Sequence, residues 1–399
     1  MKKVLANLLF FFSLMPFISP YPIGTDVQPI SLMLGTILLI WRFFEKRLPL
    51  DYFAICFILI AIFSILYGGF DPENNFEARH RFGLIFAFIT FIAIYYYFDL
   101  FSPKVLMAAI FLNFMGIIWH SLSPGTFEPF AELIVRTIKV HAPGRGVTGF
   151  AAETSFNSIT ALVQLIITFF FYNNKKISLS FFLTSLFFCM TVILLTSSGT
   201  GYLLTLLVFG TFFLYKLSLR SIFTILIILP IFTVGFLNSN LSDTRGGLLL
   251  KTVLTNPSIL LLDGSVSERL LALEIGFRAL QMNPLGYGGG SYEKVARKAD
   301  EKYSLVYKYE NLGICCGRGK NYLKETISSF SRYSIELGIF FTFFLIFIVY
   351  KCASLNLYNM LAIPLAVVLI LVSFSILFPP TYLLLITSIY QKKYNLEKV

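Results

Sequence analysis

Long runs of apolar residues, separated by short polar connections, make up most of the chain. Most runs have about 17–22 residues, the length that an α-helix needs to cross the ~30 Å hydrocarbon core of a bilayer, and the last is shorter. Helices also satisfy their own backbone hydrogen bonds, as a lipid environment requires. We expect about twelve spans, or about eleven if the last is re-entrant. They cover residues 4–20, 28–44, 50–68, 82–98, 104–121, 156–172, 178–196, 200–215, 221–237, 328–350, 356–377 and 379–390.

Two longer polar segments, 122–155 and 238–325, interrupt this series. The pattern therefore predicts one all-α integral membrane domain over residues 1–399, a polytopic transmembrane helical bundle with two outward-facing loops. In the larger loop an amphipathic run over 270–281 stops at Asn283-Pro284. We expect a short helix there, with Ser265 or Ser267 as its N-cap.

Composition agrees with this pattern. The chain is 57% hydrophobic and only 13% charged, and its mean hydropathy is +0.78, which excludes a water-soluble fold for most of it. The net charge of +11 is of the sign that nucleic acids attract, but many basic residues stand at the ends of apolar runs, as topology signals do. We therefore expect the lipid bilayer, and no nucleic acid, as a partner.

The basic connections alternate with the less basic ones along the chain. They lie around Lys2, Arg42, Lys104, Lys175, Lys216, Lys351 and Lys392. By the positive-inside rule this side is cytoplasmic. Both termini are then cytoplasmic as well, and both long polar segments face outward.

Within 122–155 the richest stretch runs from Arg145 to Ser155 and leads into an apolar run. Gly146 and Gly149 allow close backbone approach to a ligand, and the Arg145 guanidinium suits phosphate oxygens. Glu153 and Ser155 fall at the membrane interface, where a carboxylate usually has a partner or a task. Alternatively, Arg145 reaches lipid headgroups and Glu153 caps a helix.

In the larger segment, Arg269 and Arg278 are separated by about two and a half helical turns and so lie on roughly opposite faces. A flexible turn follows them, and its backbone amides are suited to surround a phosphate or a sugar. Its glycines are Gly286, Gly288, Gly289 and Gly290. Arg318 and Lys324 precede the next apolar run and extend the cationic rim.

Hydroxyl groups and glycine gather between two apolar runs at 196–201, in the order Thr-Ser-Ser-Gly-Thr-Gly. This stretch either binds a sugar or only turns the chain. The three histidines, His80, His120 and His141, form no metal-binding pattern, and no Asp-x-Asp pair occurs. We therefore expect no metal and no other cofactor.

Together these motifs resemble the O-antigen polymerase (Wzy) and O-antigen ligase superfamily. The resemblance covers about residues 30–380 and rests on short motifs in order along the chain. They are Arg145-Gly-x-x-Gly with Glu153-x-Ser155, the 196–201 hairpin, and Ser267-Glu-Arg269 with Pro284-Leu-Gly-x-Gly288. The ligases have a histidine near the end of the large loop, but 324–338 has none. The arginine often found in the hairpin is also absent, so a polymerase is favoured.

The resemblance implies a membrane-embedded glycosyltransferase of GT-C-like fold, independent of metal, at the periplasmic face of the bacterial inner membrane. Its substrate would be an undecaprenyl-diphosphate-linked oligosaccharide, with a chain-length regulator and a flippase as candidate partners. Arg145 and Arg269 would bind the diphosphate with support from Arg278, and Glu153 would orient the acceptor or act as base. The alternatives are a ligase that transfers polymer to a lipid or protein, and a transporter of lipid-linked sugar.

Overall fold

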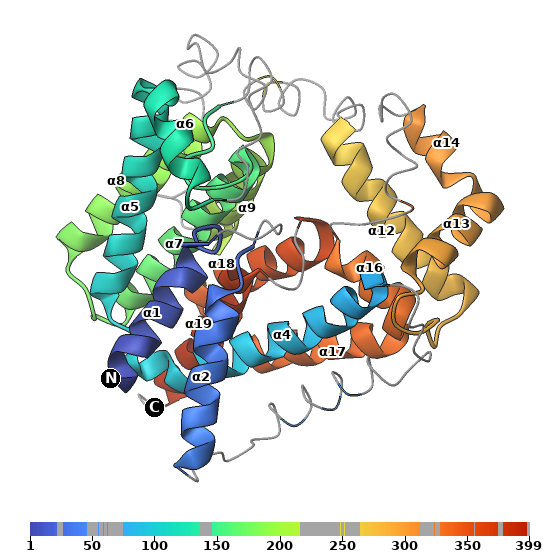
Figure 1. Ribbon diagram of the computed structural model, residues 1–399, viewed down its shortest axis with the longest axis horizontal. Coiled ribbons are helices and arrows are strands. Elements are labelled where there is room, and N and C mark those ends of the chain that lie inside the picture. Colours follow the sequence, from blue (N-terminus) through green and yellow to red (C-terminus); the bar gives the residue numbers. More distant parts are fainter. Residues whose placement is uncertain are drawn as a thin grey trace.

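The structure is a computed structural model. It describes residues 1–21, 27–45, 75–135, 146–215, 264–311, 328–354, 356–373 and 378–396, and the single residues 55, 59, 62, 248, 251 and 323. Over this part of the chain the regular structure is helical, apart from one isolated antiparallel bridge between Ile18 and Val135 (Figure 1). The expected all-α fold is confirmed there.

Helices from distant parts of the sequence share one apolar core. The helices of this bundle are α1 (Lys2–Leu14), α2 (Ile30–Phe44), α4 (Asn75–Tyr97), α5 (Pro103–Leu122), α7 (Thr154–Asn173), α8 (Leu179–Thr196), α9 (Gly199–Tyr215), α17 (Ile339–Cys352), α18 (Leu357–Val368) and α19 (Pro379–Leu396). Two short elements adjoin them, η1 (Phe98–Leu100) before α5 and α6 (Pro124–Glu132) after it. Helix α7 is central. Of the residues in its most apolar 18-residue stretch, 78% are buried, against 39% for α5 and 28% for α8.

Among the described residues, three helices are long and apolar enough to cross a membrane: α5, α7 and α8. They coincide with the expected spans 104–121, 156–172 and 178–196. Shorter apolar helices occur where five other spans were expected, in α2, α4, α9, α17 and α18. The expected spans 50–68 and 221–237 lie outside the described residues, apart from isolated positions.

The expected single span 328–350 is wrong. Two helices occupy it, α16 (Ser329–Leu337) and α17, and they meet at Gly338. Gly338 has φ +60° and ψ −141°, a conformation that side-chain-bearing residues rarely adopt and that ends a helix. Likewise α18 passes into a π-helical turn, η4 (Leu369–Ser373), within the expected span 356–377.

A second hydrophobic cluster lies beside the bundle and belongs to a polar lobe, defined here as α12 (Gly264–Met282), α13 (Tyr292–Tyr303) and α14 (Leu305–Glu310). These helices stand together at one side in Figure 1, drawn yellow to orange. Ile335 of α16 joins their core, so α16 connects the lobe to the bundle. We expected Ser265 or Ser267 to be the N-cap of α12. This expectation is wrong, because the helix already includes Gly264.

Candidate functional site

The glycine segment, residues 146–150, lies against the C-terminal end of α8. The Val147 backbone N–H donates to the Leu195 carbonyl oxygen at 3.3 Å. A Cβ atom at position 146 would lie 2.4 Å from that same oxygen, so only glycine fits there. The first residue after Arg145 therefore has a fixed environment, whereas Arg145 itself lies outside the described residues.

Helices α5 and α7 hold the rest of this segment. Gly149 has φ +57°, and its N–H donates to His120 Nδ1 at 3.2 Å. Asn157 Nδ2 donates to the Thr148 carbonyl oxygen at 2.8 Å. The Phe150 ring lies over Gly116, where a Cβ atom would come within 2.4 Å of it. The glycine segment is thus packed structure between three helices.

The hydroxyl-rich hairpin 196–201 is a tight turn between α8 and α9. Ser197 is left-handed, with φ +46°, and α9 begins two residues later. Two of its hydrogen bonds are local: Ser197 Oγ donates to the Leu194 carbonyl oxygen at 3.2 Å, and Ser198 Oγ accepts the Gly201 N–H at 3.3 Å. Of the two alternatives for the hairpin, these bonds favour a turn in the chain and not a sugar-binding site.

This hairpin packs on the first turns of α7. The hydroxyls of Ser158 and Thr196 form a hydrogen bond. A Cβ atom at Gly201 would lie 2.4 Å from Ser158 Cβ. Since Val147 also binds Leu195, the structure brings together the glycine segment and the hairpin, two motifs that α7 and α8 separate in the sequence.

Glu153 and Ser155 stand where α7 begins. Glu153 is the N-cap residue, with extended backbone angles, and its carbonyl oxygen accepts the Asn157 N–H at 3.3 Å. This position agrees with the alternative in which Glu153 caps a helix, although its side chain makes no capping hydrogen bond. Both residues are half-buried. Arg318 and Lys324, like Arg145, lie outside the described residues.

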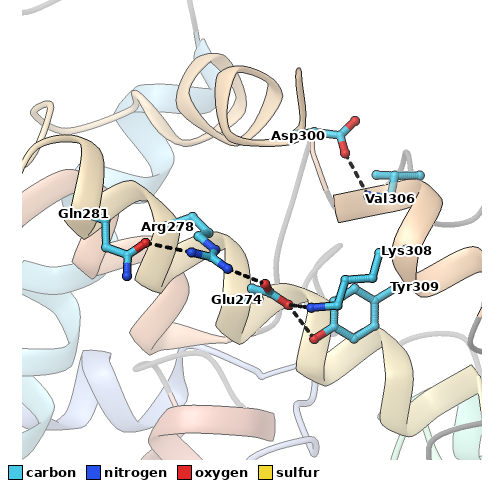
Figure 2. Close-up of polar contacts among 7 residues, drawn as sticks. All are labelled: Glu274, Arg278, Gln281, Asp300, Val306, Lys308 and Tyr309. Carbon is cyan, nitrogen blue, oxygen red and sulfur yellow. Dashed lines mark hydrogen bonds and ion pairs between the residues drawn. The ribbon is translucent and has the colours of Figure 1, made fainter. Parts of the chain in front are cut away.

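Arg278 belongs to an ion network inside the polar lobe (Figure 2). Its Nη2 lies 3.3 Å from Glu274 Oε1, and its Nη1 donates to Gln281 Oε1 at 3.0 Å. The guanidinium also lies 4.7 Å from the centre of the Tyr303 ring on α13. These contacts give Arg278 a structural task, which is to hold α12 against α13.

Glu274 is the centre of that network. Its Oε2 lies 2.7 Å from Lys308 Nζ and accepts a hydrogen bond from Tyr309 Oη at 2.8 Å, both on α14 (Figure 2). Burial alone would raise the pKa of Glu274, but the hydrogen bonds from Lys308, Tyr309 and Arg278 and the Lys308 charge outweigh it and hold the pKa below its ordinary value. Burial and the Glu274 carboxylate in turn raise the pKa of Tyr309.

Arg269 lies on the other side of α12. Gly276 packs directly on α16, since a Cβ atom there would lie 2.9 Å from Ser331 Cα. Arg269 precedes Gly276 by about two turns and so shares its face, which is turned toward α16 and η4. Arg269 is half-buried there. The two arginines therefore occupy opposite faces, as expected.

The glycine turn after α12 interlocks with the helix break at Gly338. Pro284 supplies its carbonyl oxygen to the Ile339 N–H at 2.8 Å. Gly286 has φ +88° and lies so near that a Cβ atom there would be 2.6 Å from the Gly338 nitrogen. We call this arrangement the clasp, formed by residues 284–290 and 335–339.

The amides that we expected to surround a phosphate bind the end of α16 instead. Tyr287 N–H donates to the Ile335 carbonyl oxygen at 2.9 Å, and Gly288 N–H to the Glu336 carbonyl oxygen at 3.0 Å. Gly290 N–H donates to the Glu336 carboxylate at 3.2 Å. Glu336 is only 2% exposed. Gly286, Gly288 and Gly289 thus shape a packed turn.

Sequence reasoning missed Glu336, Gly338 and His120. One signal was available for the first two, because an acid followed by Leu-Gly inside an expected membrane span is costly unless it has a partner. Nothing in the sequence pairs His120 with Gly149. Within the described part of the chain, no group of three or more His, Cys, Asp or Glu side chains is arranged to hold a metal ion.

Comparison with known proteins finds no family model that matches this chain and no curated protein similar to it in sequence. The resemblance drawn from the motifs therefore stays a prediction.

Proposed function

We propose that the chain is a membrane-embedded polysaccharide polymerase of the O-antigen type. It transfers a glycan from an undecaprenyl-diphosphate carrier to the next lipid-linked repeat unit at the periplasmic face of the inner membrane. The acceptor hydroxyl oxygen bonds to the anomeric carbon as the bond from that carbon to the phosphate oxygen breaks. The hydroxyl proton passes to Glu153, and the lipid diphosphate leaves with its charge balanced by Arg145 and Arg269.

The observation that carries this proposal is the location of Arg269. It is a half-buried cation on the α12 face that packs on α16, where the polar lobe meets the apolar bundle. A lipid-linked sugar has the same division, with an apolar chain on one side of its diphosphate and a polar glycan on the other. A guanidinium at such a boundary binds phosphate oxygens through paired N–H donors and needs no metal.

The packing of the first motif onto the hairpin supports the same proposal. Glu153 stands at the start of α7, next to the glycine segment that follows Arg145, and α7 is the most enclosed of the three long apolar helices. A carboxylate there is partly screened from water, which suits a base that accepts a hydroxyl proton.

The test uses purified protein in detergent with EDTA and a synthetic undecaprenyl-diphosphate oligosaccharide repeat. We expect a ladder of lengthened glycan on a gel. Transfer of a single glycan to an added lipid or protein acceptor would identify a ligase instead. Absence of any transfer, together with substrate-coupled ion movement in proteoliposomes, would identify a transporter and refute the proposal.

Two arginine variants sharpen this test. We expect Arg269→Ala to lower ladder formation by about 100-fold or more, the usual effect of losing a donor that balances developing charge. Arg297→Ala is the matched control, because Arg297 forms an exposed pair with Glu293 on α13 at 2.6 Å, and such surface pairs contribute little. Equal activity of the two variants would remove Arg269 from the site.

A further inference from the structure

His120 lies in the last turn of α5, and its ring binds the glycine segment. The side chain is fully buried and stacks on Phe127 with ring centres 4.5 Å apart. Its Nδ1 accepts the Gly149 N–H at 3.2 Å and lies 3.4 Å from Thr148 Oγ1. A nitrogen that accepts a backbone N–H carries no proton itself, so this contact requires the neutral ring with its proton on Nε2.

The hydrogen bond between His120 and Gly149 determines the direction in which the backbone enters α7. Gly149 stands shortly before Glu153, and its φ of +57° turns the backbone toward the first residue of that helix. Asn157 holds the same turn from α7 through the Thr148 carbonyl oxygen. His120 and Asn157 thus fix the turn from two helices, and Glu153 follows Gly149 by four residues.

We propose that His120 is a positioning residue for the proposed glycosyl transfer, and that its neutral ring, bound to the Gly149 N–H, sets the location of Glu153. This inference rests on the proposed function and deepens it. Protonation of Nδ1 replaces the hydrogen bond by two opposed N–H groups, which releases the glycine segment. The transfer therefore stops when His120 is charged.

The groups around the His120 ring have opposite effects on its protonation. Glu128 of α6 lies 3.6 Å from His120 Nε2 and favours the charged ring. The other carboxylates on the adjoining elements are Glu132, one turn later on α6, and Glu153, before α7. Burial of the ring and the Gly149 N–H favour the neutral ring. The titratable group of α8 is the thiol of Cys189, which is buried.

The first experiment measures ladder formation about one pH unit above and below the ordinary imidazole pKa of about 6.5. We expect wild-type activity to fall at least about 10-fold across this interval. His120→Asn is the key variant, because its amide oxygen takes the place of Nδ1 as acceptor and does not titrate. It should keep most activity at the higher pH and lose less than about 2-fold at the lower. An unchanged acid loss in His120→Asn would overturn the proposal.

The second experiment does not depend on activity. Hydrogen exchange of the Gly149 amide, corrected for its intrinsic pH dependence, should accelerate about 10-fold or more in acid in the wild type and stay constant in His120→Asn. If Gly149 exchange follows this pattern but no glycan ladder forms, the His120 contact is supported and the proposed glycosyl transfer is overturned. A ladder with pH-independent exchange in the wild type would overturn the role of His120 and leave the proposed function standing.

Discussion

Gly338→Ala tests whether the clasp joins the polar lobe to the bundle. The added Cβ atom would lie 2.3 Å from the Pro284 carbonyl oxygen, 2.4 Å from the Leu285 carbonyl carbon and 2.5 Å from the Gly286 nitrogen. All three are backbone atoms, so no side-chain rotation relieves the overlap. The backbone of Gly338 is also at φ +60° and ψ −141°, which alanine adopts only under strain.

The expected cost follows from these two terms. Backbone strain of this kind costs about 1–3 kcal/mol. Overpacking by one methyl group costs about 1–3 kcal/mol more, which brings the destabilisation of the clasp to about 2–6 kcal/mol. At about 1.4 kcal/mol per factor of ten, the clasp should open about 30-fold to about 10⁴-fold more often.

Hydrogen exchange at two of the amides that bond across the clasp, those of Gly288 and Ile339, measures this opening directly. Gly210→Ala is the matched control, since its Cβ atom would meet nothing within 4 Å on α9. Alanine is also the better helix former there, by about 1 kcal/mol. If exchange at both amides in Gly338→Ala equals that in the wild type and in Gly210→Ala, the steric reasoning is refuted.

Two further predictions concern other contacts. Glu274→Gln should weaken the docking of α14 on α12 by about 1–3 kcal/mol, because the amide keeps the shape of the side chain but loses the charge that holds Lys308. Limited proteolysis of the chain after α12 would measure this weakening. Since the folded pKa of Glu274 is lowered, its stabilisation is complete above the ordinary pKa of 4.5 and is lost as pH falls through the lower folded value. Acid should therefore detach α14 in the wild type and change little in Glu274→Gln, as limited proteolysis with an acid protease would show. Gly201→Ala should destabilise the hairpin by about 1–3 kcal/mol, and Ser158→Gly in the same chain should recover part of that loss in thermal unfolding, because it removes the Cβ atom that the new methyl group would meet.

The sequence located the helices where run length and polar ends agree. The expected spans 104–121, 156–172 and 178–196 differ from α5, α7 and α8 by two residues or fewer at each end. The end of α12 was also predicted closely, because Asn283-Pro284 stops a helix. Its start was missed, since residues 264–269 are polar and lack the apolar period that was followed along the chain.

Contacts between distant segments were beyond the sequence pattern. Apolar periodicity does not register a break at a single glycine, so 328–350 looked continuous although Gly338 divides it. The glycine turn was expected to be flexible and to surround a phosphate or a sugar, but the Tyr287 and Gly288 amides have a protein partner, and no local pattern distinguishes a helix end from a phosphate. The bond from Gly149 to His120 likewise joins residues 29 positions apart.

The clasp also determines when the polar lobe becomes anchored during synthesis of the chain. Gly290 and Glu336 are 46 residues apart in the sequence, so the ribosome finishes α12 and α13 well before their anchor on α16 exists. Until then the lobe lacks Ile335, the residue through which α16 enters its core. Nascent chains that end before Ser328 should therefore carry an unanchored lobe, open to proteases, and the lobe should become resistant only when the downstream residues 328–339 have been synthesised.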